Sequence, residues 1–259
     1  MKTLARDEAL LMLNKVPEVT LYFWIIKTMA TTVGETGADF LNFNLNFGLT
    51  GTSLVMAGLL AVFLFIQLRA RKYVPWLYWM NVVLISIVGT LITDNLVDNF
   101  GIALETTTAA FGIALLATFA LWYAREKTLS IHSIVTTRRE LFYWAAILFT
   151  FALGTAAGDL VAESMKLGYA NSALMFGALI AAVTVAYYGF KANAVLAFWI
   201  AYILTRPLGA SCGDWLSQPI ANGGLGLGTV TTSLIFLTTI LGLVVFLSVT
   251  RKDVIPRTA

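Results

Sequence analysis

The segment YWAAILFTFALGTAAGDLVAE, Tyr143–Glu163, is apolar at first, then rich in small residues, and carries two carboxylates near its end. Three other segments align with it without gaps: FWIIKTMATTVGETGADFLN from Phe23, YWMNVVLISIVGTLITDNLVD from Tyr78 and FWIAYILTRPLGASCGDWLSQ from Phe198. Each begins with Phe or Tyr followed by Trp, has Gly ten residues after that Trp, and has Asp five residues after that Gly. Agreement of these anchors in four places indicates four copies of one repeat.

The spacing of the copies describes a pair of pairs. The four Asp residues follow one another at 55, 65 and 55 residues, at Asp39, Asp94, Asp159 and Asp214. Plainer apolar runs lie between the copies, at about 49–68, 105–123, 170–189 and 227–249. Because a membrane-spanning helix needs about 20 apolar residues, each repeat is predicted to be a helical hairpin, a signature helix followed by a plain helix. The chain is therefore expected to have eight transmembrane helices.

Composition agrees with this fold class. Of the 259 residues, 59% are hydrophobic and only 12% are charged, about half the charge of a soluble domain. We expect an all-α membrane protein. Since each repeat crosses the membrane twice, all signature helices run in one direction, and the two halves, offset by 120 residues, are expected to be pseudo-symmetric about the membrane normal.

The basic residues predict the orientation. Fourteen Lys and Arg residues lie on the side of the termini and only Lys166 lies on the other, which puts both termini in the cytoplasm. The tryptophans that open the repeats are then expected to form an aromatic belt on the inner side. The predicted organisation is a cytoplasmic N-terminal arm, a first half of spans 1–4, a cytoplasmic linker, a second half of spans 5–8 and a cytoplasmic tail, at 1–17, 18–124, 125–139, 140–250 and 251–259.

Polar residues recur every four positions along the signature helices, so they share one face. If these faces meet at a common axis, they line an acidic cavity open to the outside. The candidate metal ligands are Glu35, Asp39, Asp94, Asp98, Asp159, Glu163 and Asp214. Lys27 and Arg206 lie in the same columns and are expected to form ion pairs or to gate the cavity. Glycines and Pro207 are expected to break these helices near the site. The alternative is that the acids cap helix ends in the outer headgroup region and bind nothing.

The leading functional hypothesis is a secondary transporter, an exporter, for a divalent metal cation such as Mn²⁺ or Mg²⁺. Hard cations take oxygen ligands, and crowded carboxylates that are not all ionised would exchange protons for metal. A transporter or channel for Na⁺ or organic cations would use the same acids with the aromatic faces of Phe40, Phe43 and Trp215. Pairs such as Asp94 and Asp98 allow a third hypothesis, an intramembrane carboxylate enzyme. A sensor or scaffold that binds metal without transport is a fourth.

Several other classes are disfavoured. Cys212 is the only cysteine and His132 the only histidine, so a His- or Cys-rich metal site is excluded. No paired His or activated Ser is present, so the protein is not expected to be an enzyme. No nucleotide-binding motif or resident cofactor is expected, nor is a nucleic-acid partner. The expected partners are the lipid bilayer and the transported cation, and a homo-oligomer is compatible with the sequence.

The motifs GETGADF, GTLITDNLVD, GTAAGD and RPLGASCGD resemble a bacterial family of integral membrane proteins, described as uncharacterised membrane-anchored proteins, built from four copies of a repeat of about 55 residues. The likeness extends from KVPEVTLYFW to VTRKD. It implies the eight-helix fold and a place in the bacterial inner membrane, but little chemistry. A looser similarity, to cation exporters with a Glu-x-Gly-Asp motif, covers only the combination of small residues and acids.

Overall fold

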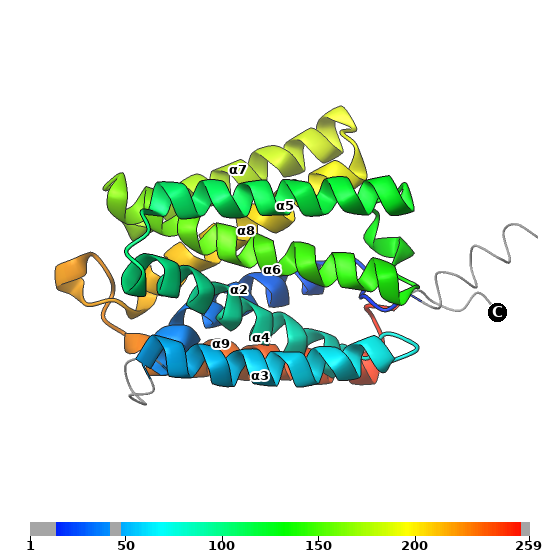
Figure 1. Ribbon diagram of the computed structural model, residues 1–259, viewed down its shortest axis with the longest axis horizontal. Helices are drawn as coiled ribbons and strands as arrows, with labels where there is room; N and C mark the ends of the chain where they lie inside the picture. The colour runs from blue at the N-terminus through cyan, green and yellow to red at the C-terminus, as the bar shows by residue number, and fades with distance from the viewer. Residues whose placement is uncertain (1–13, 42–47, 255–259) are drawn as a thin grey trace, which may run out of the picture.

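The computed structural model describes residues 14–41 and 48–254. These residues form α-helices and short helical turns, with no β-strand among them. The helices lie side by side along the long axis of the molecule (Figure 1). The α-helices are α2 Leu21–Asp39, α3 Gly48–Arg69, α4 Pro75–Asp94, α5 Leu104–Glu126, α6 Thr137–Asp159, α7 Tyr169–Phe190, α8 Ala194–Ser217 and α9 Gly228–Thr250.

Seven of these helices, α3 to α9, are long and apolar enough to cross a membrane. The all-α membrane class predicted from composition is therefore confirmed for the described residues, as a multi-pass helical protein. The other long helix, α2, has 19 residues and includes Lys27, Glu35 and Asp39, which lower its hydropathy. It is nevertheless central to the bundle, because it packs against α4, α8 and α9.

Local sequence fixes several helix boundaries. The hydroxyl oxygens of Thr20 and Thr136 accept hydrogen bonds from backbone N–H groups three residues later, and the Asn193 side chain caps α8 in the same way. Pro75 occupies the first turn of α4, where its missing N–H costs nothing. The C-terminal ends of α5, α7 and α9 are closed by three basic residues whose backbone is in the left-handed conformation: Lys127, Lys191 and Arg251.

The signature helices form a closed inner ring. Helix α2 packs on α4, α4 on α6, α6 on α8, and α8 returns to α2. Each plain helix packs mainly against the signature helix of the next repeat: α3 against α4, α5 against α6, α7 against α8, and α9 against α2. The inner helices carry most of the buried residues, whereas large apolar side chains on α3, α5, α7 and α9 are exposed.

Glycine allows the inner helices to approach closely at all four contacts of the ring. A Cβ added at Gly89 would lie 2.8 Å from the Phe151 Cβ, closer than real Cβ atoms come. In each signature helix, the glycine lies five residues before the signature Asp. It faces a residue on the neighbouring signature helix that lies eight residues before that helix's own Asp. The pairs are Gly34 with Ser86, Gly89 with Phe151, Gly154 with Arg206, and Gly209 with Thr31. Because the spacing is the same in every repeat, the four glycine contacts lie at one level along the axis of the bundle.

A second level of contacts is aromatic. The first aromatic residue of each repeat lies against the Trp of the next, with ring centroids 5.5–6.3 Å apart: Phe23 with Trp79, Tyr78 with Trp144, Tyr143 with Trp199, and Phe198 with Trp24. We call these eight side chains the aromatic collar. Trp79, Trp144 and Trp199 are buried in it and pack helix against helix. Their predicted position at the inner membrane surface stays a prediction.

The collar lies toward the end of the bundle that carries most of the basic residues, which we call the basic end. Here the Lys15 Nζ lies 2.8 Å from a carboxylate oxygen of Glu140, which is fully buried. The other oxygen of Glu140 accepts a hydrogen bond from Gln67. This buried network ties the segment before α2 to α3 and α6. The opposite end, where the signature helices finish, is the acidic end.

Candidate functional site

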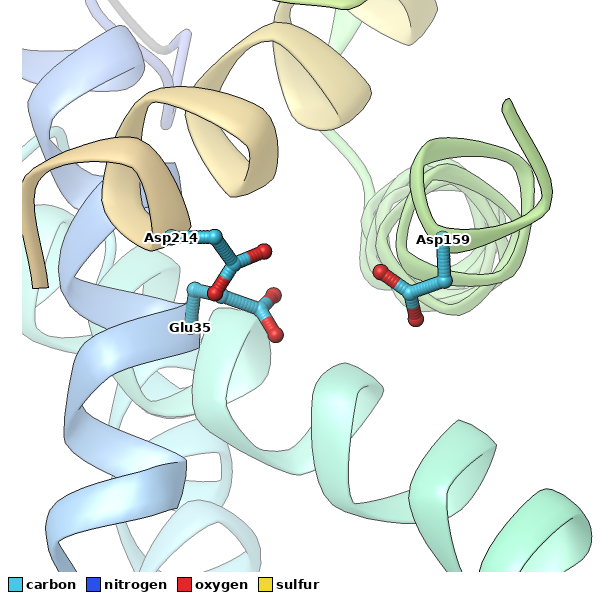
Figure 2. A group of neighbouring side chains, drawn as sticks. All are labelled: Glu35, Asp159 and Asp214. Carbon is cyan, nitrogen blue, oxygen red and sulfur yellow. The ribbon is translucent and has the colours of Figure 1, made fainter. Parts of the chain in front are cut away.

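Three carboxylates from three different repeats converge at the acidic end. Figure 2 shows Glu35 of α2 and Asp214 of α8 side by side, with Asp159 of α6 facing them. One oxygen from each carboxylate lies within 4.8 Å of the others. Glu35 and Asp214 are buried and Asp159 is half-buried. We call these three residues the carboxylate triad.

The triad has the size of a site for one hard cation. Two oxygen ligands on opposite sides of a Ca²⁺ ion lie about 5 Å apart, and small rotations of the side chains would bring them to the shorter distances of Mg²⁺. Carboxylate oxygens are the ligands that such ions prefer. Three carboxylates this close repel one another, so the arrangement favours a bound cation or protons.

The other four predicted ligands surround the triad without joining it. Asp39 and Asp94 are half-buried, and Asp98 and Glu163 are exposed. Asp94 interacts electrostatically with Glu35 and Asp159, and Asp39 interacts with Glu35 and Glu163. The Glu163 carboxylate accepts a hydrogen bond from the Tyr169 hydroxyl at 3.0 Å. The seven acids therefore form one electrostatic cluster that becomes more exposed toward the acidic end.

The helices are not broken at this cluster, so that part of the sequence prediction is wrong for α4, α6 and α8. Helix α8 continues through Pro207 to Ser217. After Asp94 and Asp159 the chain continues as π-helical turns, Asn95–Asn99 and Leu160–Ser164. Such wider turns are frequent at functional sites. Here the wider turns follow the signature Asp directly and carry the exposed acids Asp98 and Glu163.

Arg206 lies directly behind the triad. Its guanidinium Nη2 is 2.9 Å from Glu35 Oε2 and 2.7 Å from Thr155 Oγ1, and it also contacts the Thr90 hydroxyl. The side chain is fully buried, and its Nε has no hydrogen-bond partner among the described residues. Arg206 therefore forms an ion pair with a carboxylate on a different helix. Arg206 thus occupies the centre of the ring, in contact with all three other signature helices.

Lys27, the other cation in the predicted columns, has partners of a different kind from those of Arg206. Its Nζ donates to the Tyr202 carbonyl oxygen at 3.0 Å and to the Thr205 hydroxyl. It lies 4.3 Å from the centre of the Tyr202 ring and 5.0 Å from that of Phe151. Lys27 is fully buried and makes no ion pair with any carboxylate in the described part of the chain. The ion pair predicted for it is therefore absent there.

We call Arg206, Lys27 and their polar partners the polar column. The sequence did not predict two of these partners. Tyr202 and Thr205 lie on α8 beside Arg206, and Tyr202 is four residues before it on the same helical face. That spacing places Tyr202 on the face of Arg206, but aromatic residues are so frequent on these helices that spacing alone does not single it out. From the acidic end, the order is the triad, Arg206, Lys27 with Tyr202, and the aromatic collar.

The aromatic side chains considered for organic cations are less well placed. Trp215 is exposed and Phe40 is half-buried. Phe43 lies outside the described residues. Cys212 is a half-buried free thiol.

Comparison with known proteins identifies the repeat. The family described as Repeat of Unknown Function (DUF347) matches residues 22–73, 77–128, 142–193 and 197–253. The four matches cover most of the sequence, so the chain belongs to this family, and the four-repeat resemblance is confirmed. No curated protein matches the chain. No solved structure matches it either.

Proposed function

We propose that this protein is a secondary transporter that exports a divalent metal cation such as Mn²⁺ or Mg²⁺. The observation that carries the proposal is the convergence of Glu35, Asp159 and Asp214 from three repeats within 4.8 Å. Packing alone does not require three carboxylates this close together, since their mutual repulsion opposes folding. A cation removes that repulsion.

Arg206 would act as the gate on the inner side of this site. Its guanidinium compensates the charge of Glu35 at 2.9 Å, so it resembles a tethered cation at the edge of the site. A metal ion bound by the triad would compete with it for Glu35. Release of Glu35 by Arg206 would couple ion binding to movement between α2 and α8.

Protons are the proposed counter-ion. The triad cannot hold three negative charges without compensation, so carboxylates that lose a metal ion would take up protons. Metal binding and proton release are then linked by mass action. This linkage supplies a driving force from a proton gradient without a nucleotide site.

The proposed setting is the bacterial inner membrane, with eight spans as four hairpins, two pseudo-symmetric halves about the membrane normal, and both termini in the cytoplasm. Four family matches along the chain and the repeated contacts of glycines and aromatic residues around the ring support the symmetry. The basic end would face the cytoplasm. The acidic end, with Asp98 and Glu163, would face outward.

Titration calorimetry on the purified protein tests the site, with Mn²⁺, Mg²⁺, Ca²⁺ and Zn²⁺ at pH 6 and pH 8. Asp214→Asn keeps the shape of the side chain and removes one counter-charge, so affinity should fall by about tenfold or more. Binding by the parent should strengthen at pH 8, because competing protons leave. Glu105→Gln is the matched control, since it removes an exposed carboxylate of α5 outside the cluster. Equal affinity of the parent and Asp214→Asn for every ion would refute the proposal.

A further inference from the structure

A second candidate binding site lies away from the carboxylate triad. A cavity of about 530 Å³ lies between α2, α7 and α8 and the loop that contains Leu129 and His132. This volume is in the range that holds small organic ligands. The cavity follows α8 from Ala194 to Leu208, which corresponds to about 20 Å of helix. It therefore suits an elongated molecule better than a single ion.

The walls of the cavity are mainly aromatic and aliphatic. Trp24 and Phe198 lie on one side, with ring centroids 5.7 Å apart. Tyr187 of α7 contributes to the opposite wall and is 38% exposed. Since α7 is the helix with the smallest buried fraction among the candidate spans, the cavity borders the surface that would face lipid. An apolar ligand could enter from the bilayer.

Charge distinguishes the two ends of the cavity. Glu18 is the carboxylate among its described lining residues, and it belongs to the segment before α2, at the basic end. At the far end, halfway along α8, the lining residue Thr205 accepts a hydrogen bond from the Lys27 Nζ. A positive group is thus attracted to the Glu18 end of the cavity.

We propose that this cavity binds an amphipathic organic monocation. Its charged group would lie beside Glu18, and its apolar body would lie against Trp24, Phe198 and Tyr187. Aromatic faces also attract organic cations. The site is independent of the proposed metal transport, because none of its described lining residues belongs to the seven-acid cluster.

His132 makes this site sensitive to pH. Its Nδ1 lies 3.4 Å from Glu18 Oε1, and the contact with Glu18 raises the pKa of the imidazole. Protonated His132 therefore competes with a bound cation for Glu18, and its deprotonation frees the carboxylate. Other titratable groups close to this pair are Tyr187 and Tyr188 of α7, which line the same cavity, and Asp253, whose carbonyl oxygen accepts from the Glu18 N–H. Lys27 lies behind Thr205, toward the far end of the cavity.

Trimethyl(4-phenylbutyl)ammonium, whose charge lies at one end of an apolar body, is a suitable probe, and 4-phenylbutan-1-ol is its neutral counterpart. Calorimetry on the purified full chain should show binding of the cation that is about tenfold weaker in Glu18→Gln, since one counter-charge is lost. Binding to the parent should strengthen from pH 6 to pH 8.5. His132→Gln should bind at pH 6 as tightly as the parent binds at pH 8.5.

Two controls separate this site from the carboxylate triad. Asp214→Asn should bind the probe like the parent, even if it loses metal binding, so failure of one proposal leaves the other testable. Glu105→Gln should also be unchanged, and thermal unfolding checks that each variant is folded. Equal affinity of Glu18→Gln and the parent, equal affinity for the neutral compound, or loss of binding in Asp214→Asn would each overturn the inference.

Discussion

The contact between Arg206 and Glu35 offers the sharpest test of the polar column. In Arg206→Gln, Glu35 remains buried, with 6% of its surface exposed, but loses its guanidinium partner at 2.9 Å. Breaking a buried ion pair by removing one partner costs about 3–5 kcal/mol. The hydroxyls of Thr90 and Thr155 also lose a donor, but both still donate to backbone carbonyls of their own helices. The uncompensated Glu35 therefore dominates the cost.

The assay is denaturant unfolding of the purified protein in mild detergent, with the free energy of unfolding compared between variants. Arg206→Gln should lose about 3–5 kcal/mol, and the double variant Glu35→Gln with Arg206→Gln should recover most of it, since no buried charge is left alone. A divalent cation at 100 times its Kd should add about 2.7 kcal/mol to a variant that binds it. Arg138→Gln, which changes an exposed arginine, is the matched control. If Arg206→Gln unfolds like the parent, the guanidinium does not balance the charge of Glu35.

Three further tests address other parts of the molecule. Gly89→Val should cost about 1–3 kcal/mol through overpacking, because its Cβ would lie 2.8 Å from that of Phe151. Gly58→Val should cost less, since no heavy atom of the described residues lies within 4 Å of a Cβ added there. Equal unfolding midpoints of the two variants would contradict the close packing. The contact with Glu18 raises the pKa of His132. The pairing should therefore stabilise the fold below the unfolded pKa of about 6.5, and this stabilisation should be lost as pH rises through the higher folded pKa. Thermal unfolding should show a larger difference between the parent and His132→Gln at pH 5.5 than at pH 8.5, and equal differences would refute the pairing. Reporter fusions at residues 102, 167 and 222 should report the outer side and those at 72, 132 and 191 the cytoplasm, and any reversal would contradict the parallel arrangement of the repeats.

The sequence predicted the all-helical membrane fold, because that fold depends on the spacing of the repeats and on the length of the apolar runs. The ten residues from Trp to Gly and the five from Gly to Asp are the same in all repeats, so packing at one level requires packing at the others. The plain runs predicted at 105–123 and 170–189 agree within a few residues with α5 and α7. Spacing could not predict which signature helix each plain helix contacts, because apolar surfaces are interchangeable in sequence.

The composition of the site was predicted less completely. All seven acids lie in one cluster, but spacing alone does not distinguish Asp214, which joins the triad, from Asp94, which does not. Lys27 was expected to have a carboxylate partner because of its charge. It instead uses a carbonyl, a hydroxyl and two aromatic faces, and these partners come from helices far away in sequence.

The divergence of the repeats follows from the geometry of the ring. Four equivalent positions meet at each level, so four arginines in place of Arg206 would repel one another at the centre. A single guanidinium avoids this repulsion, and the other three repeats can then supply acceptors for its N–H groups. Four residues before each signature Asp, those repeats supply Glu35, Thr90 and Thr155, which all contact Arg206. The same position in its own repeat is Ala210, which brings no further polar group. A repeated scaffold with one cation and three unlike acceptors therefore places an asymmetric polar column directly behind the carboxylate triad.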